Sequence, residues 1–488
     1  MNSNINRGSN PGSVINRGPG PGRPTANSPL ANRNISREVR LPNNTVAAFR
    51  PDGSPRFVRA NGMTIVHGPA GQRQIALERP DHTAVVANAV GHGYVQRPFA
   101  YRNVTFINRT YYVHGTAYTR IYRPYVYRGV TLNRYVPARY YSPTFYNWVY
   151  TPWRAPVSYR WVWVGRPWTV YYGPYFAPAP VYPSASLWLA DYLVSSTLET
   201  AYQDRVDNNP APLTNYPAPS QGTPAVTTTA ITPEVKQAIA AEVERQIAFE
   251  KSEGQLTTPG VAPDPAQTSL PAELNDNNSH AFVVAVTLNV TSTDGQECSV
   301  TEGDVLQLNG PPPDNSAGAD VMVLASKDRD CRQGSTITVG IQDLQEMQNQ
   351  MRALVDQGMG ELQAHGNGLP SPPADASGGV TTASFISTAP GADPNAAVEI
   401  RQELQQASEM EKQVLAQAKA ADSAGPVAQN GPGSSPPTIA LNQSINQIVA
   451  IKGYPNQIAN VGTKQIYVYS DMKIIFTNGK VSDVQDVQ

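Results

Sequence analysis

The first patterned region of the chain, from Thr45 to about Pro137, consists of short runs in which apolar and polar residues alternate. Turn residues separate these runs, for example Asp52-Gly53, Asn61-Gly62 and Gly68-Pro69. Successive side chains of a strand point to opposite faces, and Gly-containing turns of this kind join antiparallel neighbours. The region therefore predicts an antiparallel β-meander or roll.

The pattern changes between Tyr94 and Tyr192, where aromatic residues are concentrated. This stretch holds 19 of the 24 tyrosines and all six tryptophans, many of them beside Pro or Arg. Proline cannot donate to a β-ladder and is confined to edges and bulges. We therefore expect an extended, polyproline-like chain laid over a sheet, with Arg side chains stacked on the rings.

Three segments have helical patterns. The first runs from Ser184 to about Arg205, and the second starts at the cap Thr232-Pro233-Glu234 and carries a narrow apolar stripe at Val235, Ile239, Val243 and Ile247. The third begins at Asp393-Pro394 and continues to about Ala420, with a 3-4 apolar repeat that Glu411 interrupts. We expect this third helix to be solvated or loosely packed, and a short coiled coil is the alternative.

The clearest β-rich unit runs from His280 to about Gln363. Ala281–Val290 is a strongly β-forming run, about four further short strands follow it, and an amphipathic helix begins near Ile341. The stretch Glu302-Gly303-Asp304-Val305-Leu306 resembles the turn of bacterial SH3-type domains. That resemblance implies a small SH3-like barrel within residues 280–340.

The chain's last part, from about Pro437, reads as a compact α/β unit. A helix over Asn442–Ile451 is followed by Gly453-Tyr454-Pro455, two strands, the hairpin signal Asn478-Gly479 and a final strand. These residues resemble the SmpA/OmlA (BamE-like) lipoproteins of outer-membrane assembly over about 50 residues. Because the family's lipidated N-terminal Cys has no counterpart here, the resemblance implies the fold and not membership in the assembly machinery.

Together these patterns predict a mainly β, multi-module protein, α+β overall, with disordered Pro/Gly-rich linkers. The expected division is 1–44, a disordered basic N-terminus; 45–206, β-rich, then Tyr/Trp/Pro/Arg-rich and ending in a helix; 207–231, linker; 232–254, helix; 255–278, linker; 279–364, SH3-like barrel plus helix; 365–392, linker; 393–421, helix; 422–436, linker; and 437–488, the BamE-like unit.

Charge is divided unevenly along the chain. The first 180 residues contain 22 Arg, no Lys and four acids, a net charge of +18, whereas the remainder contains 15 basic and 34 acidic residues, a net charge of −19. This polarity suggests an anionic partner or the protein's own acidic half. The alternative is that both halves simply face solvent.

The two cysteines bear on the compartment. Cys298 and Cys331 fall inside one β-rich unit, which favours a structural disulfide and an oxidising environment, with two buried thiols as the alternative.

The Tyr/Pro/Trp block followed by Leu187-Trp188-Leu189 is similar to Tyr/Trp-rich bacterial envelope proteins, which implies an extracytoplasmic location in the periplasm, at the outer membrane or on the cell surface. No signal peptide is visible after Met1, so we expect a leader upstream, a mature chain or, failing both, a cytosolic protein. No transmembrane helix is expected.

No catalytic or metal-binding motif stands out, and no cofactor is expected. The six histidines form no HxH, HExxH or Cys/His cluster, and the chain lacks GxSxG and the Gly-rich nucleotide loops. His92, between Gly91 and Gly93, reads as a structural turn residue. An enzyme whose site forms only in three dimensions is the remaining alternative.

The Arg/aromatic block is the one candidate for binding. Aromatic faces stack on sugars or bases, and Arg grips phosphate or carboxylate. Three interpretations compete: a structural aromatic core, binding of an anionic envelope polymer such as peptidoglycan or polysaccharide, and nucleic-acid binding, which the lack of Lys and of an RNP-like motif disfavours. Partner envelope proteins and self-association fit the same surface. The candidate binding residues are Tyr122, Arg123, Tyr125, Trp148, Trp153, Arg154, Arg160, Trp161, Trp163, Arg166 and Trp168. The sequence thus predicts a non-enzymatic structural or interaction protein of the envelope, or a self-assembling extracellular one.

Overall fold

The computed structural model of the chain combines helices with several antiparallel sheets. It describes residues 35–68, 72–208, 231–256, 274–313, 316–327, 331–364, 368–373, 376 and 379–423, and in the C-terminal part 439, 443, 448, 457–461, 464–469, 472–477 and 480–486. These residues belong to two compact units, Met1–Lys419 and Ala420–Gln488. The protein is therefore of mixed α and β structure.

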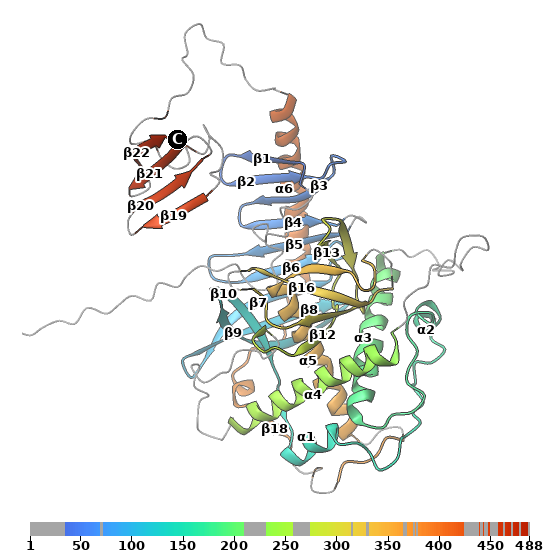
Figure 1. Cartoon of the computed structure of the whole chain (residues 1–488). Coiled ribbons are helices and arrows are strands. Elements are labelled where there is room, and N and C mark those ends of the chain that lie inside the picture. The colour runs from blue at the N-terminus through green and yellow to red at the C-terminus, as the bar shows by residue number, and fades with distance from the viewer. Residues whose placement is uncertain are drawn as a thin grey trace, which may run out of the picture. The chain divides into compact units, whose positions relative to one another are not determined.

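A ten-stranded antiparallel meander forms the first part of the larger unit, with its strands in sequence order (Figure 1). The expected meander or roll is a meander. The expectation of disorder up to residue 44 is wrong for Arg37–Leu41, which pairs with the next strand, and residues 1–34 lie outside the described part. The strands are β1 (Arg37–Leu41), β2 (Thr45–Phe49), β3 (Pro55–Ala60), β4 (Met63–His67), β5 (Arg73–Glu78), β6 (Ala84–Asn88), β7 (Gly93–Tyr101), β8 (Val104–Val113), β9 (Thr116–Tyr127) and β10 (Val130–Val136).

Proline is accommodated in this sheet where a strand extends beyond one of its neighbours. Pro98 of β7 pairs with Ile107 of β8, but β6 reaches β7 only as far as Gln96. Pro124 of β9 pairs with Asn133 of β10, beyond Tyr122, the last residue of β9 that pairs with β8. Each proline therefore has a partner strand on one side only, which is the edge position that proline tolerates. Residues Tyr94–Val136 therefore form strands and turns of the meander, as the prediction of a meander to about Pro137 required, and the expectation of polyproline-like chain is wrong for them.

Helix α6 (Ala396–Ser423) covers one face of the meander and runs across its strands (Figure 1). Ala396, Ile400, Ala407 and Ala418 are fully buried against Val58, Ile65, Ile75 and Val85 of the sheet. Glu411, which interrupts the apolar repeat, bonds His67 and Arg73 across this interface, at 2.6 and 3.0 Å. The expectation of a solvated or loosely packed helix is wrong, because the repeat is the buried contact of α6 with the sheet.

The aromatic stretch after the meander forms short elements joined by irregular chain. The expected linker 365–392 contributes the strand that pairs with β11, and its Phe385 is buried against Phe106, so this part is ordered structure. The elements are β11 (Arg139–Tyr140), α1 (Pro143–Tyr150), α2 (Pro167–Tyr171), β18 (Thr381–Thr382) and a 3-10 turn at Ser384–Ser387.

Two long helices follow at the expected places, α3 (Ala185–Asn208) and α4 (Pro233–Leu256). The predicted stripe of α4 at Val235, Ile239, Val243 and Ile247 is buried. Because it packs into the same core as α3, the stripe docks α4 within the unit.

A six-stranded antiparallel sheet with order β12-β15-β16-β17-β13-β14 follows, and α5 (Ile341–Gln363) continues from its last strand. The predicted strand Ala281–Val290 is split in two, because Thr287 instead donates its backbone N–H to Glu302 at 2.8 Å. Whether this sheet is an SH3-like barrel stays a prediction. The strands are β12 (Ser279–Val283), β13 (Leu288–Ser292), β14 (Glu297–Val300), β15 (Val305–Asn309), β16 (Gly318–Ala325) and β17 (Thr336–Gly340).

The turn between β14 and β15 is organised by a buried aspartate. Asp304 accepts hydrogen bonds from the backbone N–H groups of Thr301 and Lys327 at 2.8 and 3.0 Å. Gly303 has φ +89°, which an L side chain rarely adopts, and its carbonyl accepts from Tyr175 of the aromatic stretch at 2.9 Å. Cys298 and Cys331 are joined in a disulfide that ties β14 to the segment between β16 and β17.

The hydrophobic cores of the larger unit join segments that are far apart in sequence. One core combines Tyr127 and Leu132 of the meander with the six-stranded sheet and α5, and another combines the aromatic stretch with α3, α4 and α5. The expected separate modules 45–206, 232–254, 279–364 and 393–421 are thus parts of one compact unit. Among the described helices, none has the length and apolar character needed to cross a membrane.

The smaller unit contains a four-stranded antiparallel meander of β19 (Gln457–Val461), β20 (Lys464–Val468), β21 (Met472–Thr477) and β22 (Lys480–Asp486). Ile448, Tyr467, Ile474 and Phe476 are buried together. The predicted helix Asn442–Ile451, the stop Gly453-Tyr454-Pro455 and the turn Asn478-Gly479 lie outside the described residues, apart from 443 and 448. The BamE-like fold stays a prediction.

Candidate functional site

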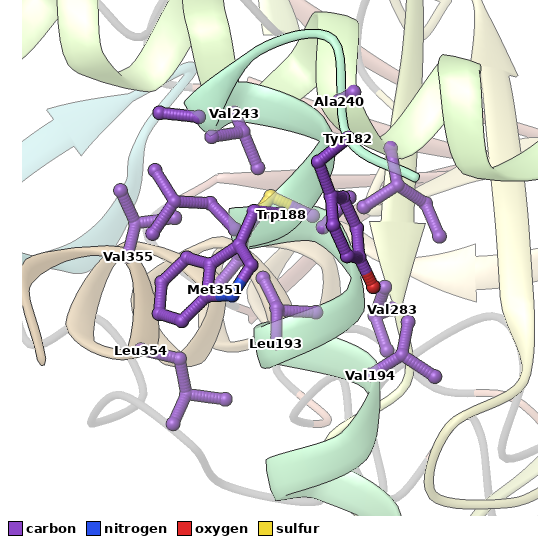
Figure 2. Close-up of a cluster of buried hydrophobic side chains, with 14 of the residues drawn as sticks. Tyr182, Trp188, Leu193, Val194, Ala240, Val243, Val283, Met351, Leu354 and Val355 are labelled. Carbon is purple, nitrogen blue, oxygen red and sulfur yellow. The ribbon is translucent and has the colours of Figure 1, made fainter. Parts of the chain in front are cut away.

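Three of the five tryptophans of the predicted binding block lie in the interior. Trp161, Trp163 and Trp168 are each at most 8% exposed, and Trp161 stacks on Trp188 of α3 with ring centroids 5.2 Å apart. Figure 2 shows Trp188 beside Met351, Leu354 and Val355 of α5, with Val243 of α4 and Val283 of β12 in the same cluster. These rings therefore form the core on which the helices pack, which favours the structural interpretation for this part of the block.

A chain of hydrogen bonds links some of the polar atoms of this core. The Trp161 indole N–H donates to the Tyr182 hydroxyl at 2.9 Å, and that hydroxyl donates to Asp191 at 2.7 Å. Asp191 also lies 2.7 Å from Lys236 of α4, so its buried charge is paired. Burial, and then the nearby carboxylate of Asp191, raise the pKa of Tyr182, which keeps its hydroxyl a donor. The network fixes how the aromatic stretch, α3 and α4 fit together.

Tyr122 and its neighbours form a second buried part of the block. Tyr122 is fully buried under Arg109, whose guanidinium lies 4.1 Å from the ring centroid. Arg109 is itself fully buried and makes a two-pronged ion pair with Glu346 of α5, at 2.7 and 2.8 Å. The partly buried Tyr125 donates its hydroxyl to Gln345 of the same helix. The expected stacking of Arg on rings thus occurs, but it fastens α5 to the sheet.

The remaining candidates reach the surface. Arg154 and Arg160 are exposed, and the structure gives neither an ion pair with any described residue. Arg166 is also exposed, but it pairs with Glu199 of α3 at 2.8 Å. Trp148 and Trp153 are half-buried and stacked on each other with centroids 6.3 Å apart, and Arg123 is half-buried.

The arginines of the meander pair largely with the acidic half of the same chain. Arg79 bonds Glu399 and Glu403 of α6, and Arg97 bonds Asp393 and Glu399. Elsewhere in the meander, Arg134 pairs with Glu253 of α4 at 2.9 Å. Of the two partners suggested by the charge polarity, the protein's own acidic half accounts for these arginines.

Two histidines and two aspartates meet at one end of the meander, a cluster that the sequence analysis did not identify. His92 lies in the turn before β7 and His114 in the turn after β8, and the pairing of Gly93 with Tyr112 brings these turns together. Asp204 and Asp207, three residues apart near the end of α3, face them. His92 Nδ1 lies 2.7 Å from Asp204, and His114 Nδ1 lies 2.7 Å from Asp207.

The cluster is accessible to solvent. The side chains of His92, His114 and Asp207 are 12%, 29% and 41% exposed. Burial raises the pKa of Asp204, although the two neighbouring imidazoles act in the opposite direction. The sequence signal that could have found the cluster is the placement of both histidines beside glycines, at the two ends of the segment that forms the β7–β8 hairpin.

Two carboxyl groups, the buried Glu250 and the half-buried Asp343, have a strongly raised pKa. Burial raises the pKa of Glu250 on α4 to about 8, with Asp356 and Glu253 adding to the shift and Arg352 opposing it. Burial likewise raises the pKa of Asp343 at the start of α5 to about 7, and nearby Glu346 adds to it. Glu250 accepts a hydrogen bond from Tyr146 at 2.8 Å inside the aromatic core. Glu250 thus lies in a largely buried group of ionisable side chains with Glu253, Arg352 and Asp356.

A groove of about 510 Å³ lies between α6 and the meander, lined by Arg73, Ala89, Leu404, Gln405, Ser408 and Glu409. None of the predicted binding residues lines it.

No protein-family model, curated protein or solved structure shows significant similarity to the chain.

Proposed function

We propose that this protein is a non-enzymatic structural or interaction protein of the cell envelope, which binds an anionic polymer such as peptidoglycan or a polysaccharide. The binding surface is the part of the Arg/aromatic block that reaches solvent: the exposed Arg154 and Arg160 with the half-buried, stacked pair Trp148 and Trp153. The observation that carries the proposal is the exposure of Arg154 and Arg160 without an ion pair to a described residue, whereas meander arginines such as Arg97 pair with acids of the same chain. Arginine forks bind carboxylate or phosphate, and aromatic faces stack on sugars.

Two features support the extracytoplasmic location within this proposal. The Cys298–Cys331 disulfide is of a kind that persists in oxidising compartments. The buried aromatic block is the feature by which the chain resembles Tyr/Trp-rich envelope proteins. The predicted SH3-like and BamE-like units would serve as further interaction modules.

Retention on purified cell-wall sacculi at low salt tests the proposal. We expect the purified chain to sediment with the sacculi, and the Arg154→Ala/Arg160→Ala double variant to bind roughly 5- to 30-fold more weakly, since two exposed charges contribute about 0.5 to 1 kcal/mol each. Arg166→Ala is the matched control, because Arg166 already pairs with Glu199. Absence of retention of the unaltered chain would exclude polymer binding. Sedimentation of the chain by itself would favour the self-assembling alternative.

A further inference from the structure

The His92–His114 cluster has a geometry that differs from two ordinary surface ion pairs. The two imidazole rings meet edge to face with centroids 4.5 Å apart, and each carboxylate approaches both rings. Asp207 Oδ2 lies 2.7 Å from His114 Nδ1 and 3.5 Å from His92 Nε2. Asp204 Oδ1 lies 2.7 Å from His92 Nδ1 and 3.4 Å from His114 Nε2. Imidazoles and carboxylates therefore alternate around a common centre, with each imidazole between the two carboxylates.

We propose that His92, His114 and Asp207 bind a divalent transition-metal ion, with Asp204 as the residue that orients the imidazoles. One ligand atom from each of the three residues lies within 4.8 Å of the other two. In a tetrahedral zinc site with bonds of about 2.0 to 2.1 Å, ligand atoms are roughly 3.3 Å apart, so small side-chain shifts suffice. Two imidazoles and one carboxylate leave the fourth position for water.

The position of Asp204 is that of the carboxylate that commonly supports a metal-bound imidazole. Its bond to His92 Nδ1 fixes the tautomer that leaves Nε2 for the ion. In the structure His92 Nε2 accepts the backbone N–H of His114 at 3.3 Å, a long hydrogen bond that the metal would replace. A metal bound through His114 Nδ1 would also replace the hydrogen bond between that atom and Asp207, at 2.7 Å, so three metal–ligand bonds take the place of two hydrogen bonds.

The backbone around the cluster favours a cation. The carbonyl end of a helix carries partial negative charge, and Asp204 and Asp207 lie at that end of α3. Arg205, which lies between them in sequence, bonds Tyr171 at 3.2 Å and stacks over the same ring. Imidazole ligands favour zinc, copper, nickel or iron over magnesium and calcium. A bound ion would clip the end of α3 to two turns of the meander.

The test titrates Zn²⁺ into the tag-free full-length chain, stripped beforehand with a chelator, using calorimetry, and records the visible absorption of Co²⁺ as a second probe. We expect one ion per chain with a dissociation constant in the micromolar range or tighter, and no displacement by Mg²⁺. His114→Asn and Asp207→Asn should each weaken binding about tenfold or more, and Asp204→Asn about 10- to 100-fold.

His82→Asn is the matched control. His82 and His114 both have positive φ, +64° and +48°, which Asn tolerates, so the two substitutions carry the same backbone effect. His82 lies outside the cluster and is 60% exposed. Circular dichroism of each variant shows whether it has folded. Zn²⁺ binding that is absent in the unaltered chain, or equally tight in folded His114→Asn and His82→Asn variants, would overturn the proposal.

Discussion

Glu250 illustrates how single buried groups set the pH response of this protein. Its carboxyl is almost fully buried beside Tyr146 and has its pKa raised to about 8, whereas the unfolded chain ionises it near 4.5. Between these pH values the folded state holds a proton that the unfolded state has released. The stability that Glu250 contributes is therefore fully present below about pH 4.5 and is lost as pH rises through about 8.

Glu250→Gln should reduce this dependence. We expect the free energy of unfolding of the unaltered chain to fall by about 1 kcal/mol per pH unit between pH 5 and 8 from this group, and the variant to show a shallower decline, because the pKa of other carboxyls such as Asp343 and Asp204 is also raised. Urea unfolding at several pH values measures the slope. The control is Glu234→Gln on the same helix, where Glu234 is exposed and its pKa is lowered by bonds to Thr232. Equal slopes for the variant and the unaltered chain would contradict the assignment.

Helix α6 shows how an element obtains its stability from a partner distant in sequence. Three of its buried side chains are Ala, so the helix lies close to the meander, and its acids pair with arginines of β5, β7 and the turn after β5. The pKa of Glu411 is lowered. Burial by itself would raise it, but the neighbouring His67 and Arg73 lower it by more. The helix and the sheet face are thus complementary in shape and charge.

Ile400→Ala should destabilise the larger unit by about 2 to 4 kcal/mol, because Ile400 is fully buried between α6 and the sheet. Val398→Ala removes an apolar side chain that is 45% exposed, two positions earlier on the same helix. It should change stability by no more than about 0.5 kcal/mol. Urea unfolding followed by circular dichroism compares them. If both substitutions had the same effect, α6 would not be packed as described.

At the scale of the molecule, the meander, the aromatic stretch and the six-stranded sheet share their cores. Tyr127 and Leu132 of the meander lie in the core of the six-stranded sheet, and Trp188 packs on α5. A piece that ends at the predicted boundary after residue 206 would expose these surfaces. The larger unit should therefore fold as a whole and not module by module.

A fragment of residues 35–423 should unfold in one cooperative transition, whereas a fragment of residues 35–206 should lack one. The shorter fragment loses α4, α5, α6 and the six-stranded sheet, which cover its apolar faces. Thermal unfolding by circular dichroism and the dispersion of amide signals in NMR distinguish the two. A cooperative transition in the 35–206 fragment would instead support independent modules.

The sequence by itself determined the local structure of this protein. Alternation and turns located most of the meander strands, and Thr232-Pro233-Glu234 marked the start of α4, because these signals act between residues close in the chain. The spacing of Cys298 and Cys331 within one unit likewise indicated the pair that the structure joins.

Only the tertiary structure decided what these elements pack against. Trp161 belongs to the core, Glu411 pairs across an interface, and His92 contacts Asp204, which is 112 residues away in sequence. The residues adjacent in sequence do not indicate any of these partners. An amphipathic pattern indicates that one face of an element is buried. The free energy gained by burying that face depends on which distant surface fits it in shape and charge. For this chain that choice decides both which arginines remain exposed and where the candidate metal ligands converge.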